Sequence, residues 1–321
     1  MRVLVTGASG FVGGAVAARL VNAGVVVRAG VRRRDAVLPS RVEPVIVGPL
    51  GPDTDWRPAL QGVEAVVHAA ARVHVMRERA QDPLGEFRRD NVAGSIALAR
   101  QAIDAGVRRM VFISSIKVNG ESTGGRSPYR ATDVPAPADA YGISKHEAEE
   151  GLRRLCLGSP IELVIIRPVL VYGPGVKGNF RAMFRWLRLG VPLPLAAVDN
   201  RRSFVGLSNL VDLIVTTLHH PAAPGHVFLA SDGEDLSTPD LLRRIGLLLG
   251  SPARLFPAPV PLINLAAGLI GRRGEAQRLC GSLQVDISEA RATLGWCPPV
   301  TVQDSLATMV QEYLKAPDGH G

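Results

Sequence analysis

The stretch that decides the fold is MRVLVTGASGFVGG, residues 1–14. It begins with a short apolar run, Val3 to Val5, which is typical of a buried parallel strand. Glycines then follow at three-residue spacing, and apolar residues recur at helical spacing: Gly7, Gly10 and Gly13, with Val12, Val16 and Leu20. The pattern therefore predicts a strand that turns sharply into a helix.

Such a turn predicts a nucleotide-binding site. The first N–H groups of a helix have no backbone partner, and they lie at the positive end of the helix dipole, which suits a pyrophosphate. Glycine is required where a side chain would block the turn, the phosphate, or the contact between helix and strand. The alternative is an ordinary glycine-rich turn, but the position between a strand and a helix favours a nucleotide cofactor.

Length and hydropathy indicate a globular α/β enzyme. The 321 residues are 46% apolar and contain no apolar run near the roughly 18 residues that span a bilayer. The nearest candidate is Val260–Ile270, which is short and is interrupted by Pro261 and Asn264. We expect a core helix or a partner-facing helix there, and no membrane partner.

Cysteine usage and the chain start predict a cytoplasmic protein. Cys156, Cys280 and Cys297 are scattered and have no metal-ligand spacing, so we expect reduced thiols and no metal site. The chain starts directly with a predicted strand, so we expect no signal peptide.

The net charge of +8 comes almost entirely from arginine, since only four of the 37 basic residues are lysines. These arginines are dispersed, aromatic residues make up only 5%, and no nucleic-acid motif is present, so we expect no nucleic-acid partner. An enzyme with anionic, phosphate-bearing ligands explains the charge better.

The end of the second predicted strand, residues 25–31, bears on the choice of dinucleotide. Arg32, Arg33 and Arg34 follow it, and no acidic residue precedes Asp35. An acidic side chain here binds the ribose hydroxyls of NAD, whereas arginine accommodates the 2′-phosphate of NADP. The sequence therefore favours NADP(H), with NAD(H) as the alternative if the arginines are only a solvated cluster.

Further strands are predicted over residues 42–47, 64–71 and 110–113. The last delivers Ser114 and Ser115 to the carboxyl edge of the sheet, where ligands bind in open α/β folds. His68, at the end of a buried strand, is expected to be a hydrogen-bonded structural residue rather than a catalytic one.

Tyr141 and Lys145 carry the predicted chemistry. They are four residues apart in a helical stretch, so their side chains share one face. A nearby ammonium favours the phenolate, and we therefore expect Lys145 to lower the pKa of Tyr141. Ser115 would then orient the substrate oxygen while Tyr141 exchanges a proton with it. The Pro-, Gly- and Ser-rich stretch 120–140 is expected to form a surface loop over the site.

With these motifs in place, the chain resembles the extended short-chain dehydrogenase/reductase family nearly end to end. The matching stretches are TGASGFVG (6–13), DNVAG (90–94), VFISSIKVNG (111–120), YGISK (141–145), RPVLVYGPG (167–175) and RRSFVGLSNLVD (201–212). The stretches SSIKVNGE and YGISKHEAEEGL are most similar to nucleotide-sugar 4-epimerases and 4-ketoreductases of bacterial surface-polysaccharide pathways.

The resemblance implies roles for individual residues. Tyr141 is the acid/base, Lys145 tunes its pKa and binds ribose, and Ser115 positions the substrate. The implied cofactor-binding residues are Gly7, Ser9, Gly10, Phe11, Val12, Gly13, Arg32, Arg33, Leu50, Ala69, Ala70, Asn91, Tyr141, Lys145 and Pro168. The implied substrate-binding residues are Ser115, Lys117, Asn179, Phe180, Arg202 and Arg278, and the resemblance also implies a homodimer.

The chain departs from the family pattern at three positions. Pro49 stands where related proteins often place an acidic residue toward the adenine, and related epimerases often have Tyr near Asn119. Lys117 stands where epimerases commonly have a small hydroxyl residue, so it either contacts the substrate or is a solvated side chain.

The expected architecture is α/β: a Rossmann-type, doubly wound parallel sheet with a smaller C-terminal substrate-binding lobe. We expect the dinucleotide-binding domain over residues 1–172, with a return segment at about 203–230. The nucleotide-sugar lobe would comprise 173–202 and 231–315, and 316–321 would be a flexible tail.

From the sequence, the favoured function is an NADP(H)-dependent 4-ketoreductase acting on a UDP-4-keto sugar, such as a 6-deoxy-N-acetylhexosamine derivative. The alternative is a UDP-hexose 4-epimerase, acting on glucose or N-acetylglucosamine, with retained NAD. An alternative of another class is a catalytically silent NADP-binding sensor or scaffold, against which the intact Ser115, Tyr141 and Lys145 argue.

Overall fold

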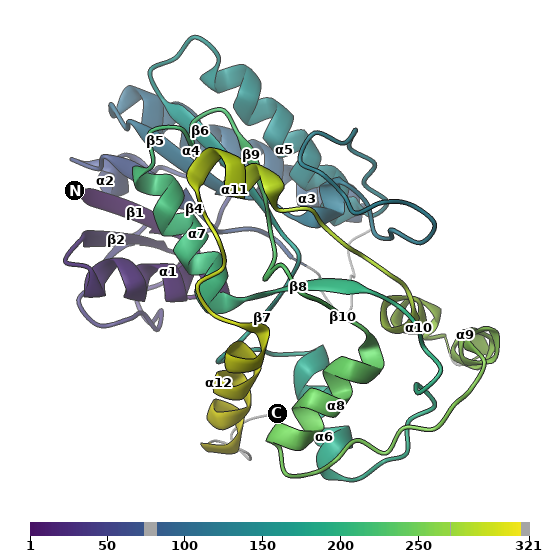
Figure 1. The fold of residues 1–321 in the computed structure, drawn as a ribbon. Coiled ribbons are helices and arrows are strands. Elements are labelled where there is room, and N and C mark those ends of the chain that lie inside the picture. Colours follow the sequence, from purple (N-terminus) through teal and green to yellow (C-terminus); the bar gives the residue numbers. More distant parts are fainter. Residues whose placement is uncertain (74–81, 270, 316–321) are drawn as a thin grey trace.

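A seven-stranded parallel sheet forms the centre of the protein (Figure 1). The computed structural model describes residues 1–73, 82–269 and 271–315. The strand order is β3-β2-β1-β4-β5-β6-β9, and every neighbouring pair is parallel. The strands are β1 (Arg2–Thr6), β2 (Val26–Val31), β3 (Glu43–Ile46), β4 (Ala65–His68), β5 (Arg109–Ile113), β6 (Glu162–Pro168) and β9 (Val227–Ala230). The predicted doubly wound α/β class is confirmed.

Helices cover both faces of this sheet because the strand side chains alternate between two apolar layers. On β1, Val3 and Val5 pack into the core beneath α1 (Phe11–Asn22) and α7 (Leu207–His219). Leu4 points the other way, into the core beneath the second group of helices. That group comprises α2 (Arg57–Leu60), α4 (Gly94–Asp104) and α5 (Ala140–Cys156).

Two short elements lead into α4. Helix α3 (Pro83–Phe87) continues as the π-helix η1 (Arg88–Ala93), which then runs into α4. A 3-10 turn, η2 (Ile116–Val118), follows β5. The predicted strand over 64–71 is shorter in the structure, since β4 ends at His68 and Ala69 begins the loop beyond it.

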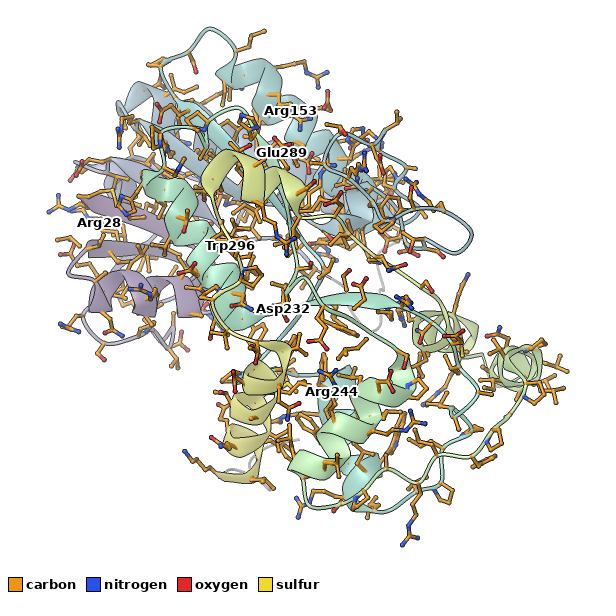
Figure 2. All side chains as sticks on the ribbon, viewed as in Figure 1. Arg28, Arg153, Asp232, Arg244, Glu289 and Trp296 are labelled. Carbon is orange, nitrogen blue, oxygen red and sulfur yellow. The ribbon has the colours of Figure 1, made fainter. Side chains whose placement is uncertain are left out.

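A second, three-stranded sheet has the order β10-β8-β7, formed by β7 (Leu170–Tyr172), β8 (Arg202–Gly206) and β10 (Asp235–Leu236). A third apolar core joins it to α6 (Asn179–Arg188), α8 (Thr238–Leu248) and α12 (Val302–Lys315). Ser237 caps α8 by accepting a hydrogen bond from Asp240 N. Asp232, labelled in Figure 2, accepts hydrogen bonds from Gly206 N (2.8 Å) and Tyr172 OH (2.8 Å), which ties this sheet to the start of α7.

Three further helices complete the described chain: α9 (Val260–Leu269), α10 (Arg273–Cys280) and α11 (Ser288–Leu294). Part of the predicted C-terminal lobe packs on the large sheet instead. Helix α11 contacts β9, and Trp296 Nε1 donates to Asp212 Oδ2 of α7 at 2.9 Å (Figure 2). The predicted tail, 316–321, lies outside the described residues.

None of the helices within 1–73, 82–269 and 271–315 combines the length and apolarity needed to cross a membrane. The expectation that Val260–Ile270 forms a core helix is wrong, because α9 contains no buried residue. The exposed helix leaves a partner-facing role open.

Candidate functional site

The glycine-rich turn joins β1 to α1 at the carboxyl edge of the large sheet. Gly7 has φ +69°, and a Cβ there would lie 2.8 Å from Ala70 N and 2.9 Å from the carbonyl carbon of Ala69. A Cβ on Gly13 would collide with Gly7 O, so the first turn of the helix packs directly on the strand end. These contacts explain why side chains are excluded from both positions.

This turn fits the pyrophosphate of a dinucleotide. Gly10 is the N-cap of α1 and provides no side-chain acceptor, and the first turn of the helix contains no acidic residue. The first N–H groups of α1 are therefore not capped by a side chain, and the helix dipole favours an anion there. Ser9 is exposed beside them, whereas Phe11 and Val12 are half-buried.

Arg32, Arg33 and Leu50, which are predicted to bind the cofactor, differ in exposure. Arg32 and Arg33 are exposed directly after β2, and Arg33 Nε lies 3.8 Å from Asp35 Oδ1. Leu50 is half-buried and packs toward α4, where it lies against Gly94. Pro49 O accepts a hydrogen bond from Thr54 Oγ1 at 2.7 Å, so this carbonyl is engaged in holding its own loop.

His68 belongs to a buried hydrogen-bond network, as the sequence predicts. Its Nδ1 lies 2.7 Å from Thr6 Oγ1, and its Nε2 lies 2.9 Å from Ser95 Oγ. Burial and the Lys145 charge lower the pKa of His68 to about 3. The ring is therefore neutral at physiological pH and links β1, β4 and α4.

Asn91, in the π-helix, holds the chain just after β4. Its Oδ1 accepts from Arg72 N (2.8 Å), while its Nδ2 donates to Arg72 O (3.0 Å) and to Ser144 Oγ (3.0 Å). This amide thus connects the loop after β4 to the helix that carries Tyr141 and Lys145. A π-helical turn is often found at functional sites, since its extra residue redirects a side chain.

Four neighbouring strands bring the site residues to one edge. Gly7, Ala69 and Ser115 follow β1, β4 and β5, and Pro168 is the last residue of β6, beside Ala230 of β9. Ser115 has an extended backbone and caps η2, with its Oγ accepting from Lys117 N at 3.2 Å.

The helix α5 positions Tyr141 and Lys145 in its first two turns. Asp139 caps this helix by accepting from Gly142 N at 2.7 Å. Lys145 is buried, with Nζ over the Phe112 ring at 3.9 Å from its centroid, and Tyr141 packs edge-on against Phe87 at 6.1 Å. Each of the two side chains is thus packed against an aromatic ring.

Burial dominates both pKa values, contrary to the prediction for Tyr141. Burial lowers the pKa of Lys145 to about 7, although the Glu149 charge opposes this. Burial, with the Asp139 charge, raises the pKa of Tyr141 to about 12 instead of lowering it. The prediction was wrong because it counted the attraction of the lysine charge and omitted the desolvation of the phenolate.

Glu149 of α5 and Arg167 of β6 form a buried ion pair that was not predicted from the sequence. Glu149 Oε1 accepts from Arg167 Nε at 2.9 Å, and the second carboxylate oxygen lies 2.5 Å from Arg167 Nη2. Ser114 Oγ donates to Glu149 (2.5 Å), and Arg167 Nη1 donates to Asn119 Oδ1 (2.9 Å). Because Glu149 follows Lys145 by four residues, the same helical spacing that selected Tyr141 and Lys145 could have indicated it.

The Lys117 ammonium forms ion pairs within the protein rather than extending into solvent. Its Nζ forms ion pairs with Glu121, at 2.8 Å, and with Asp139, the cap of α5. The half-buried ammonium therefore connects the loop after β5 to the start of α5.

Of the predicted substrate residues, the two arginines come together. Arg202 begins β8 and donates from Nη1 to Gly281 O at 2.9 Å. Burial lowers the pKa of Arg202, and so does the nearby positive charge of Arg278 on α10. Two guanidinium groups held near each other favour a polyanion such as a diphosphate.

Asn179 and Phe180 open α6, but the Phe180 ring is buried and stacks on Tyr172 at 6.0 Å between centroids. The ring forms part of the third core, and a contact between Phe180 and the substrate stays a prediction. The structure does not describe the Asn179 side chain.

No cluster of three or more metal-ligating side chains occurs among the residues that the structure describes. The three cysteines do not pair: Cys156 and Cys280 are half-buried, Cys297 is exposed, and all are free thiols.

The chain is similar to known proteins along most of its length. Residues 3–230 match the model of the NAD dependent epimerase/dehydratase family. The chain is 44% identical to a UDP-glucose 4-epimerase of Vibrio cholerae over 320 residues, which cover 98% of this chain and 96% of that protein.

Two solved structures share the fold. The first is a UDP-glucose 4-epimerase of Thermotoga maritima with UDP-glucose, which has a TM-score of 0.78 and 20% identity and covers 99% of this chain and 100% of that one. The second is a UDP-glucuronic acid 4-epimerase of Bacillus cereus in complex with NAD. The second has a TM-score of 0.76 and 19% identity, and covers 98% of this chain and 99% of the other.

Proposed function

Because the chain belongs to the NAD dependent epimerase/dehydratase family, we propose that it is a UDP-hexose 4-epimerase that retains NAD. The observation that carries this proposal is the 44% identity to the Vibrio cholerae epimerase along nearly the whole chain, together with Ser115, Tyr141 and Lys145 at the carboxyl edge of the sheet. The sequence alone favoured a 4-ketoreductase. The relatives give more support to the epimerase that was weighed beside it.

The dinucleotide would lie across the carboxyl edge of the sheet. Its pyrophosphate would meet the first N–H groups of α1, where Gly7 and Gly13 leave no side chain in the way. Lys145 would donate to the ribose hydroxyls, and the small residues Ala69 and Ala70 would allow close approach beside β4. A bound nicotinamide supplies a hydride acceptor and donor for C4 of the sugar.

The protein residues would manage the proton on the C4 oxygen. Tyr141 would accept that proton when C4 is oxidised and return it when the ketone is reduced, with Ser115 hydrogen-bonded to the same oxygen. The resting phenol is protonated, because burial raises its pKa to about 12. Its use as a base therefore requires positive charge beside it, which Lys145 and an oxidised nicotinamide together would provide.

Arg202 and Arg278 would bind the diphosphate of the sugar nucleotide. Burial and the charge of Arg278 both lower the pKa of Arg202, and a bound diphosphate would offset both effects. The sugar could then turn while the nucleotide stays fixed, as an epimerase requires, since the hydride must return to the opposite face of C4.

A second candidate is the NADPH-dependent 4-ketoreductase predicted from the sequence. The observation that favours it is the exposed pair Arg32 and Arg33 at the end of β2, where NADP enzymes bind the 2′-phosphate. A reductase must exchange its dinucleotide at every turnover, whereas an epimerase has no need to release it.

The deciding experiment identifies the dinucleotide released when the purified protein is denatured, and then assays UDP-glucose and UDP-N-acetylglucosamine without added cofactor. We expect about one NAD per chain and formation of the galacto epimer. Tyr141→Phe should slow epimer formation by about 10²–10⁴, and Tyr313→Phe, on the remote helix α12, serves as the matched control. A protein that carries no dinucleotide, epimerises neither sugar and reduces a UDP-4-keto sugar with NADPH would replace the proposal with the second candidate.

A further inference from the structure

Helix α9 presents an apolar face to solvent. Leu262, Leu265 and Leu269 are 58%, 61% and 82% exposed, and no residue of the helix is buried. Their spacing of three and then four residues places the three side chains along one face. Single exposed leucines are common on protein surfaces, but three in a row on one helix face indicate a surface that binds something.

The helix is held in place. Val260 and Ile263 pack on the third core, and α9 contacts α10. The chain before it is hydrogen-bonded to the preceding loop, with Leu193 N donating to Arg254 O at 2.9 Å and Phe256 N donating to Leu193 O at 3.0 Å. Figures 1 and 2 show α9 at the outer edge of the molecule, beyond α10 and away from the seven-stranded sheet.

Basic residues border α9 along the chain. Arg254 precedes α9, and Arg272 follows it directly, with its backbone N donating to Ala267 O of α9 at 2.7 Å; both side chains are exposed. Residues 250–281 contain four arginines and a single acidic residue, Glu275, which lies 3.8 Å from Arg272. An apolar helix face flanked by arginines matches an anionic surface with an apolar interior.

We propose that α9 docks this protein on the surface of an anionic lipid bilayer, with Leu262, Leu265 and Leu269 entering the boundary of the acyl chains. A helix of 10 residues is too short to span the bilayer, but a helix lying in the interface has no such length requirement. The sequence prediction of no membrane partner rested on spanning length alone, and the exposed face of α9 revises it.

The charges also select the membrane over a second copy of the chain. In a symmetric contact through α9, the same surface meets itself, so the arginines of the two copies would face each other. Such like-charge contacts oppose association, whereas phosphate headgroups attract the same arginines. This inference does not rest on the proposed function, because binding to vesicles is measured without turnover.

The test is flotation of the purified full chain with vesicles of phosphatidylcholine containing about one third phosphatidylglycerol. We expect the protein to float with these vesicles at low salt and to be largely released at high salt, where headgroup attraction is screened. On vesicles of phosphatidylcholine alone, we expect at least about tenfold weaker partitioning, since each basic residue near an anionic surface contributes about fivefold.

Two sets of variants separate the apolar and electrostatic contributions. Leu262→Gln with Leu265→Gln should weaken partitioning at least about tenfold, because two apolar side chains would no longer be available to enter the bilayer. The matched control is Leu157→Gln with Leu247→Gln, which changes leucines that are 85% and 70% exposed on other elements and should leave binding unchanged.

Arg254→Gln with Arg272→Gln should reduce binding to the anionic vesicles only, and circular dichroism should show unchanged folding for every variant. Absence of flotation by the wild type, or equal loss in the α9 and control variants, would overturn the proposal. So would a drop in oligomer mass for Leu262→Gln with Leu265→Gln in a protein that never binds vesicles, because a second copy would then be the occupant of this face.

Discussion

The buried pair Glu149–Arg167 leads to the sharpest stability prediction. Both side chains are almost fully buried, and Arg167 forms two hydrogen bonds to the Glu149 carboxylate and one to Asn119. Arg167→Met keeps the length and the apolar stem of the side chain but removes its charge. The Glu149 carboxylate is then left in the interior with a hydrogen bond from Ser114 and a longer ion pair to Arg153, whose Nη2 lies 3.7 Å from Glu149 Oε2.

The expected cost is about 3–5 kcal/mol of unfolding free energy, which is typical when one partner of a buried ion pair is removed. Most of it is the desolvation of a buried carboxylate that has lost its close partner rather than the lost attraction. Replacing both residues removes that charge as well. Glu149→Met with Arg167→Met should therefore be at least about 1 kcal/mol more stable than Arg167→Met alone.

Guanidinium unfolding followed by circular dichroism measures both values. The matched control is Arg243→Met, which breaks an exposed pair with Asp240 (3.0 Å) and should cost less than about 1 kcal/mol. A cost below about 1 kcal/mol for Arg167→Met would refute the reasoning. So would a double variant less stable than Arg167→Met, because the penalty would then not come from the unpaired charge.

Three further predictions follow from the site. Tyr141→Phe should lower kcat by about 10²–10⁴ with unchanged folding, and full turnover in that variant would exclude the phenol as the proton carrier. The pKa of His68 is lowered to about 3 in the folded protein, against about 6.5 in the unfolded chain. The protein should therefore lose stability as pH falls through 6.5, by about 2 kcal/mol at pH 5. Unfolding curves of His68→Asn should therefore change less between pH 7 and 5 than those of the wild type; an identical pH slope contradicts the assignment. Arg278→Gln should raise the KM for the sugar nucleotide about tenfold with little effect on kcat, while Arg243→Gln leaves KM unchanged, and equal effects of the two would remove Arg278 from the diphosphate site.

The apolar strands and the glycine turn were predictable because local patterns specify them. Val3–Val5 and the strand ending in His68 are buried on both faces, so their residues form continuous apolar runs that are visible in the sequence. Gly7 and Gly13 are fixed by close backbone contacts within the same βα unit. The helical spacing of Tyr141 and Lys145 likewise depends only on α5.

The partners of charged side chains were not predictable in the same way. Arg167 on β6 reaches Glu149 on α5, and Lys117 reaches Asp139 across a 22-residue separation. Phe180 is buried because α6 packs on the second sheet. The local sequence pattern does not indicate this packing. Each of these contacts joins segments whose proximity is set by the packing of the whole chain.

The sequence by itself thus indicated the first strands, the glycine turn and the helix face shared by Tyr141 and Lys145, because each depends on periodicity or backbone conformation within a few residues. Only the tertiary structure decided how buried those residues are. Desolvation depends on every neighbour, and it raises the pKa of Tyr141 where the local lysine alone would lower it. The same physics applies to α9, whose apolar sequence is compatible with a core helix. Its exposure follows only from what the rest of the chain leaves uncovered.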